Sequence, residues 1–170
     1  TKRTRKIKSI VSNTGPILHL QEVDLFGKMG EIHISEAVDK EIAKYCQTWF
    51  AKKPEWIIVH HLLTPYSQQA KNWEKAKLLD TGEAETIALV QQLNASWLFT
   101  DDTRSRVFAR SLGIEVHGSL GIVLWAAANH HLNRPEAETA LNSLKNSSLW
   151  ISDWVFAEAK KSLEQLFSDK

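Results

Sequence analysis

Two adjacent carboxylates, Asp101 and Asp102, stand directly after the apolar run Trp97-Leu98-Phe99. A continuous apolar run of this length is typical of a strand that is buried on both faces, as in parallel sheets. The acids therefore lie at the carboxyl end of a predicted strand, the edge at which open α/β sheets bind ligands. An aspartate at this place often caps the next helix. Because two neighbours side by side cannot both act as the cap, we expect at least one carboxylate to be free for chemistry.

Three further oxygen-bearing side chains are predicted near the same edge. Asn13 follows the β-branched run from Ile7 to Val11, and a turn or cap is the alternative interpretation of this residue. Glu83 begins a helix and has capping-box spacing to Asp80, so a purely structural helix start also fits. Glu41 borders the apolar stripe of an earlier helix, where both a rim charge and a ligand fit the pattern.

Acids that converge on one small pocket repel each other unless a cation lies among them. Carboxylate and amide oxygens are ligands for hard ions, and the sequence offers no cysteine cluster. Cys46 is the only cysteine, which excludes an intramolecular disulfide and a cysteine zinc site. The residue types therefore indicate Mg²⁺ or Mn²⁺.

The composition is that of an ordinary globular protein, with 43% hydrophobic and 24% charged residues and a net charge of +1. Nucleic acid would have to be held by a local basic patch. Arg104, Arg106 and Arg110 follow the paired acids and fit either a phosphate-binding surface or a solvated helix face. The basic segment 1–6 fits either a solvated terminus or a phosphate-contacting arm. The chain has no apolar run of membrane-spanning length and no signal-peptide pattern, so we expect a cytoplasmic protein.

Strands and helices alternate along the sequence, which predicts an α/β protein with a mainly parallel five-stranded sheet in a three-layer α/β/α sandwich. We expect one domain over residues 7–170. The predicted strands are Ile7 to Val11, Glu31 to Ile34, Trp56 to Leu62, Trp97 to Phe99 and Ile114 to His117. Two C-terminal helices are predicted over Leu132 to Leu144 and Ser152 to Phe167. Their apolar docking face is predicted to comprise Trp150, Ile151, Trp154 and Phe156, with a dimer or partner surface as the competing use.

The order and spacing of several short motifs resemble the short, stand-alone PIN-domain proteins related to VapC toxins. The resemblance runs from about Ile7 to Phe167. It is carried by SNTGPIL, ISEAVDKEI, DTGEAETIAL, LFTDDTRSRVFARSLGIEVHGSLGIV and WISDWVF. It implies a Mg²⁺- or Mn²⁺-dependent endoribonuclease that leaves a 3′-hydroxyl and a 5′-phosphate. RNA as substrate, an antitoxin protein over the acidic cleft and a homodimer are the partners that it implies.

Residue by residue, the resemblance implies that Asn13, Glu41 and Glu83 take the first three acidic positions and that Asp101 with Asp102 takes the last. Thr100 matches the threonine that the family motif usually places two residues before the ligand, which favours Asp102 over Asp101. Glu85 is a weaker substitute for Glu83. Thr14 is a further candidate for contact with phosphate or with water on the metal.

Asn13 departs from the family, in which most members carry aspartate at this position. An asparagine still offers a carbonyl oxygen to a hard cation, but it lacks the negative charge and cannot act as a base. We therefore expect weaker metal binding. The alternative function is a catalytically weakened PIN-fold module that binds nucleic acid or protein.

Overall fold

A five-stranded parallel sheet forms the centre of the computed structural model, which describes residues 9–21 and 23–168. The strands lie in the order β3-β2-β1-β4-β5, and each of the four pairings is parallel. Their bounds are β1 Ile10–Ser12, β2 Ile32–Ser35, β3 Ile57–His60, β4 Trp97–Phe99 and β5 Val116–His117. The predicted sheet is confirmed. The predicted basic segment 1–6 and residues 7 and 8 of the first predicted strand lie outside the described residues.

Helices connect the strands, as the predicted alternation requires. They are α1 Thr14–His19, α2 Phe26–Met29, α3 Glu36–Tyr45, α4 Trp49–Lys52, α5 Tyr66–Lys75, α6 Thr81–Leu93, α7 Thr103–Ser111, α8 Ser119–Ala128, α9 Arg134–Lys145 and α10 Asp153–Ser168. The short helices α2 and α4 were not predicted, because a single turn shows no apolar periodicity. Within the described ranges, no helix is both long and apolar enough to cross a membrane.

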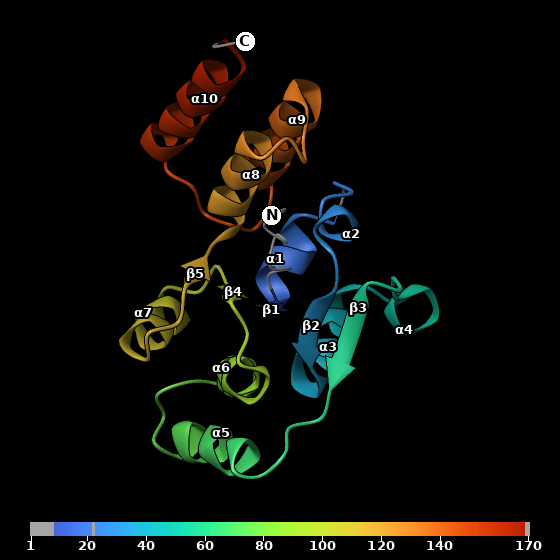
Figure 1. Ribbon diagram of the computed structural model, residues 1–170, viewed down its shortest axis with the longest axis vertical. Helices are drawn as coiled ribbons and strands as arrows, with labels where there is room; N and C mark the ends of the chain where they lie inside the picture. Colours follow the sequence, from blue (N-terminus) through green and yellow to red (C-terminus); the bar gives the residue numbers. More distant parts are fainter. Residues whose placement is uncertain (1–8, 22, 169–170) are drawn as a thin grey trace, which may run out of the picture.

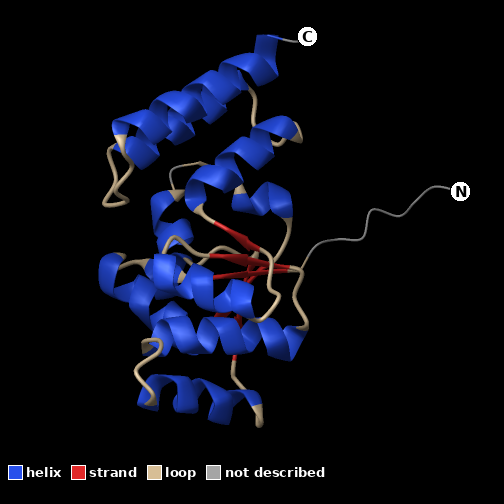
Figure 2. Ribbon diagram, turned by 90° about the vertical axis from the view of Figure 1, so that its left-hand side faces the viewer, coloured by secondary structure: helices blue, strands red, loops and turns tan. Residues whose placement is uncertain are grey.

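Helices cover both faces of the sheet, and each face has its own hydrophobic cluster (Figures 1 and 2). The direction of side chains alternates along β4: Trp97 and Phe99 join one cluster, and Leu98 joins the other. The first cluster includes residues of α1, α3, α8, α9 and α10, and the second includes residues of α5, α6 and α7. The arrangement is the predicted three-layer α/β/α sandwich.

Polar side chains start four helices at the carboxyl edge of the sheet. The N-caps of α1, α3, α6 and α7 are Asn13, Ser35, Asp80 and Asp102, and each side chain accepts a backbone N–H of its helix. A helix that packs antiparallel to its strand begins at that strand's carboxyl end, so these caps gather where ligands bind in α/β sheets. The polar residues that start these helices therefore also lie close to one another at the candidate site.

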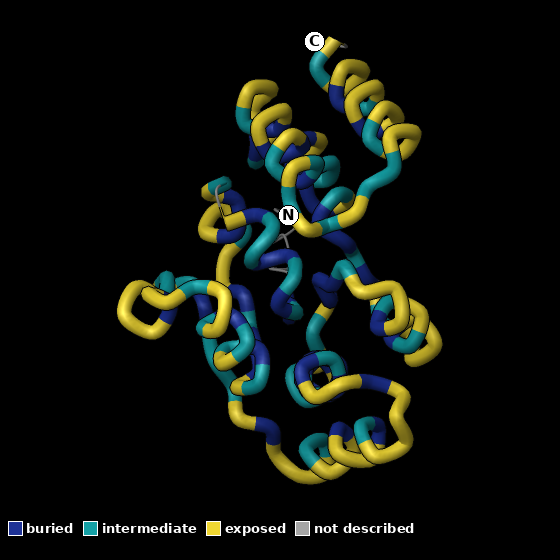
Figure 3. Tube along the Cα trace, turned by 180° about the vertical axis from the view of Figure 1, so that it is seen from behind, coloured by how far each residue is buried: buried dark blue, intermediate teal, exposed yellow. Residues whose placement is uncertain are grey.

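The C-terminal helices α9 and α10 extend the first cluster, since Leu144 and Leu163 are buried in it. Ile151 and Phe156 pack against the same cluster, as predicted. The prediction is wrong for the two neighbouring indoles, because Trp150 and Trp154 are 83% and 74% exposed. Figure 3 shows the exposed outer surfaces of these helices and the buried strands. The two tryptophans are therefore surface features that the packing of the domain does not explain.

Candidate functional site

A pocket of about 420 Å³ lies at the carboxyl edge of the sheet and is lined by acids from several elements. The site residues predicted from the sequence that line it are Asn13, Thr14, Glu41, Glu83, Asp101 and Asp102. Gly15, Leu18, Tyr45, Asp80 and Ser148 complete the lining. We call this the acid pocket. Glu85 lies elsewhere, in a neighbouring pocket, where its Oε1 accepts the backbone N–H of Ala37 at 3.3 Å.

Asn13 holds the end of β1 to the start of α1. Its side-chain oxygen accepts the N–H of Thr14 at 2.9 Å, and its Nδ2 donates to Oγ1 of Thr100 at 3.4 Å. The cap predicted as an alternative role for Asn13 is therefore present. One of the two lone pairs of the amide oxygen is used by this cap, and the other is available to a further donor or cation.

Glu41 reaches the acid pocket from α3. Its Oε2 accepts the hydroxyl of Thr14 at 3.0 Å. Gly82, in the first turn of α6, leaves the space that this carboxylate needs: a Cβ at Gly82 would lie 3.0 Å from Oε2 of Glu41 and 3.7 Å from Oδ1 of Asp80. The absent side chain thus lets carboxylates from α3 and α6 approach each other.

Glu83 belongs to the capping box of α6. Its N–H donates to Oδ1 of Asp80 at 2.8 Å, and its Oε2 accepts the N–H of Asp80 at 3.0 Å. Burial raises the pKa of the Glu83 carboxyl group, the N–H of Asp80 opposes this, and the carboxylates of Asp80 and Asp102 raise the pKa further. Glu83 is thus both a structural residue and one member of a group of mutually repelling acids.

Both members of the aspartate pair accept a backbone N–H at the start of a helix. Asp102 accepts the N–H of Ser105 at 2.8 Å within α7, whereas Asp101 accepts the N–H of Ser119 at 2.7 Å. Asp102 is the N-cap of α7, and Asp101 instead binds the first residue of α8, whose N-cap is Gly118. The two also differ in exposure: Asp102 is exposed, and the Asp101 side chain is only 10% exposed.

Asp101 also anchors a chain of hydrogen bonds that the sequence did not indicate. Its Oδ2 accepts Nδ1 of His19 at 2.8 Å and the hydroxyl of Ser119, and Nε2 of His19 lies 3.2 Å from Oγ of Ser148. Burial acts to raise the pKa of Asp101, but the hydrogen bonds from His19 and Ser119 outweigh it and lower the pKa. Asp101 is therefore an acceptor, which requires the proton on Nδ1 of His19.

The oxygen ligands in the acid pocket suit a hard cation, but they are not drawn together around one point. Within the described residues, no group of three or more histidine, cysteine, aspartate or glutamate side chains could hold a metal ion. The caps that hold Glu83 and Asp102 turn one oxygen of each toward backbone N–H groups. Mg²⁺ commonly keeps several waters and binds through one or two carboxylates. The donor set thus fits a hydrated ion rather than a closed protein cage.

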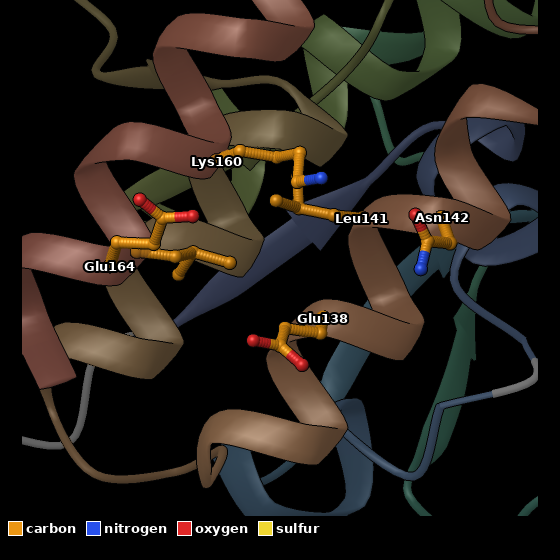
Figure 4. Close-up of a pocket in the computed structure, with 6 residues that line it drawn as sticks. Glu138, Leu141, Asn142, Lys160 and Glu164 are labelled. Carbon is orange, nitrogen blue, oxygen red and sulfur yellow. The ribbon is translucent and has the colours of Figure 1, made fainter.

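The predicted RNA-binding arginines lie outside the acid pocket. Arg104 is exposed on α7, and Arg106 lines a neighbouring pocket that also includes Asp101. A further pocket lies between α9 and α10 (Figure 4). Its volume of about 210 Å³ is below the range of typical ligand sites, and it shares no lining residue with the acid pocket. The acid pocket therefore remains the candidate site.

A comparison with protein-family models gives one result for this chain. A model described as a PIN domain matches residues 9–165, which is almost the whole chain. A comparison with curated proteins found no match.

Proposed function

The chain belongs to the PIN-domain family, whose members are generally nucleases, and from this premise we propose that it is a metal-dependent endoribonuclease. The observation that carries the proposal is the acid pocket itself. It joins Glu41, Glu83 and Asp102, from three separate elements, in a volume of about 420 Å³. Burial is the main cause of the raised pKa of Glu83, and the carboxylates of Asp80 and Asp102 raise it further; a cation would relieve this repulsion, which supports the same proposal.

In this proposal Glu41, Glu83 and Asp102 surround a hydrated Mg²⁺ or Mn²⁺ ion and bind it through one or two carboxylates and otherwise through its waters, with the amide oxygen of Asn13 as a neutral ligand. When bound, such an ion activates water, polarises the scissile phosphate and neutralises charge on the leaving oxygen. The chain's own contribution is orientation. The Thr14 hydroxyl fixes the Glu41 carboxylate, and the caps of α6 and α7 fix Glu83 and Asp102. Arg106, which lines the neighbouring pocket, and Arg104, which is exposed on α7, hold RNA phosphates in this proposal.

Asn13 favours a second candidate function, a PIN-fold module that binds RNA or protein without cutting it. Its amide carries no charge, and part of its hydrogen-bonding capacity is already used by Thr14 and Thr100. A ligand of this kind binds a divalent ion more weakly than a carboxylate does. The two candidates differ in one measurable property, which is metal-dependent cleavage.

The experiment is cleavage of a pool of single-stranded and structured RNAs with Mg²⁺ or Mn²⁺, by the wild-type chain and by a Glu83→Gln, Asp102→Asn double variant. Both amides keep the helix starts, since Gln serves in a capping box and Asn is a good N-cap. The substitutions therefore remove two charges and leave the fold in place. We expect metal-dependent cleavage by the wild type and its loss in the variant.

The matched control is Glu136→Gln, which lies in the equivalent capping box of α9 with Asn133 and outside the acid pocket. It should cut RNA at the wild-type rate. If the wild type binds Mn²⁺, measured by calorimetry, and cuts no RNA in the pool, the endoribonuclease proposal fails and the binding module is favoured. Cleavage that survives in the double variant would remove Glu83 and Asp102 from the mechanism.

The proposal also takes the protein as a cytoplasmic toxin of a toxin–antitoxin pair, with an antitoxin over the acid pocket and a homodimeric state. The support for this part is the sequence resemblance to VapC toxins. Expression of the chain in bacteria should then arrest growth, and the double variant should not.

A further inference from the structure

A second pocket of about 400 Å³ shares a wall with the acid pocket, since Asp101 lines both. It lies between the starts of α7 and α8 and the segment 149–155. We call it the indole pocket and define it by Asp101, Arg106, Gly118, Leu120, Trp150 and Val155. Its walls present polar and apolar groups in nearly equal measure. Its volume falls within the range of sites for small ligands, and its lining offers both an apolar surface and hydrogen-bonding groups.

Trp150 is the most exposed large hydrophobic residue of this region, at 83%. Its neighbours Leu149 and Ile151 pack against the core, so the backbone of the segment is held in place while the indole faces solvent. An exposed aromatic ring on an anchored backbone at the rim of a pocket is the kind of platform on which proteins stack unpaired nucleic-acid bases. Trp154 is comparably exposed, at 74%, but does not line the pocket.

Arg106 supplies the second observation. Its Nε is buried and has no hydrogen-bond partner among residues 9–21 and 23–168. A Cβ at Gly118 would lie 3.2 Å from Nη1 of Arg106 and 3.2 Å from Oδ1 of Asp101, so the glycine leaves room for the guanidinium. A buried donor without a partner is unfavourable, but this Nε is closed to solvent, so a ligand meets Arg106 only through the part of its side chain that lines the pocket.

We propose that the indole pocket binds an unpaired base of the RNA beside the cleavage point, with the base stacked on Trp150 and an acceptor oxygen of the same nucleotide bound by Arg106. This inference rests on the proposed ribonuclease function and narrows its substrate to RNA with a single-stranded nucleotide at that point. The bases of a duplex are already stacked within the helix and are not available to the pocket.

A second copy of this chain fits the indole pocket less well. The net charge of the chain is +1, so a second copy brings no excess of negative charge to the guanidinium. An apolar contact would also leave the part of the Arg106 side chain that lines the pocket without an acceptor. A nucleotide supplies both an aromatic face for Trp150 and acceptor oxygens for Arg106. The shared Asp101 wall places such a nucleotide next to the proposed cleavage site.

The test is the affinity of the full chain for a fluorescein-labelled single-stranded RNA octamer, measured by anisotropy with Ca²⁺ in place of Mg²⁺. The variants are Trp150→Ala, Trp150→Phe, Arg106→Gln and, as the matched control, Trp154→Ala. Loss of one stacked base should weaken binding by roughly fivefold to a hundredfold in Trp150→Ala. Trp150→Phe should restore most of this affinity, and Trp154→Ala should change it less than about twofold.

Two further readouts separate the possible outcomes. Addition of the octamer should shift the indole N–H signal of Trp150 in a ¹H–¹⁵N spectrum, with the signal assigned by its absence from Trp150→Ala. Unchanged affinity in Trp150→Ala, or equal losses in Trp150→Ala and Trp154→Ala, overturns the inference and leaves the ribonuclease proposal standing. If Trp150→Ala instead converts a dimer to a monomer in sedimentation and keeps its RNA affinity, the surface belongs to a second copy. Failure of the wild type to bind any RNA would overturn the inference and the proposed function together.

Discussion

Asp101 is surrounded by donors: it accepts the N–H and the hydroxyl of Ser119 and Nδ1 of His19. Burial opposes its ionisation, yet these hydrogen bonds lower its pKa below 3.8. A carboxyl group with a lowered pKa in the folded state stabilises the fold above its unfolded pKa, and this contribution is lost as pH falls through the lowered value. Asp101 therefore ties α1, the start of α8 and the β4–α7 connection together at neutral pH.

We expect Asp101→Asn to lower the free energy of unfolding at pH 7 by about 1.5–3 kcal/mol, the usual contribution of hydrogen bonds to a charged group. The amide offers one acceptor where the carboxylate has two. Urea unfolding at pH 7 measures the difference in the free energy of unfolding between the wild type and Asp101→Asn. This difference should become smaller as the pH is lowered through 3.8 and below. Asp102→Asn is the control and should change stability by less than about 0.5 kcal/mol, because Asn is an equally good N-cap. Equal destabilisation by the two substitutions would contradict this assignment.

Glu83 should show the opposite pH dependence. Burial raises its pKa, the Asp80 N–H acts against this, and the carboxylates of Asp80 and Asp102 raise it further. An acid with a raised pKa in the folded state adds relative stability at low pH, and this is lost as pH rises from 4.5 through the raised value. Glu83→Gln removes the titration and keeps the capping box. The Tm of Glu83→Gln at pH 7 should equal or exceed that of the wild type, and any increase in Tm should be smaller below pH 4.5. A Tm well below that of the wild type at pH 7 would refute this prediction.

At the scale of elements, the first turn of α6 contains a residue that lowers helix stability and makes room for the acid pocket. Gly82 lies in the first turn of this 13-residue helix, where alanine would be the better helix former. A Cβ there would lie 3.0 Å from Oε2 of Glu41, which is the flexible end of a side chain. The helix therefore tolerates alanine at position 82, while the Glu41 carboxylate has to move.

We expect Gly82→Ala to leave the free energy of unfolding unchanged or to raise it by up to about 1 kcal/mol. Mn²⁺ affinity should fall severalfold, because the Glu41 carboxylate has to shift by a few tenths of an ångström within the acid pocket. Calorimetric titration with Mn²⁺ and urea unfolding measure the two effects. Gly121→Ala in α8 is the matched control: a Cβ there meets nothing within 4 Å, so it should stabilise similarly and leave Mn²⁺ affinity alone. Unchanged Mn²⁺ affinity in Gly82→Ala would exclude Glu41 from the metal site.

Elements with strong local signals could be predicted from the sequence. The apolar run Trp97–Phe99 became β4 with the same bounds, and the capping box at Asp80 starts α6 as expected. The end of α5 at Lys75 has no such signal, since the positive φ of 57° at Lys77 is not indicated by its residue type. The hydrogen-bonded series from Asp101 through His19 to Ser148 could not be predicted. Its members come from three distant segments, and nothing in their local sequence indicates the contact.

At the scale of the whole molecule, the prediction of one domain over residues 7–170 depends on whether both faces of the sheet unfold together. Adjacent residues of β4 belong to opposite hydrophobic clusters, so neither cluster can lose the strand without affecting the other. The first cluster also contains Leu163 of α10, which is 3% exposed. Nε2 of His19 lies 3.2 Å from Oγ of Ser148, so the α9–α10 connection meets the site as well.

We therefore expect Leu163→Ala in α10 and Leu89→Ala in α6 to lower the same single unfolding transition, each by about 2–5 kcal/mol. Urea unfolding, followed by far-UV circular dichroism and by tryptophan fluorescence, should give coincident curves and an unchanged m-value in both variants. Leu166→Ala is the control on α10, since Leu166 is 37% exposed and should cost much less. A separate early transition in Leu163→Ala, with the α6 region still folded, would make α9 and α10 an independent unit. In that case the acid pocket should keep its Mn²⁺ affinity after α9 and α10 unfold. One domain predicts the opposite, because Ser148, in the segment between α9 and α10, lines the acid pocket.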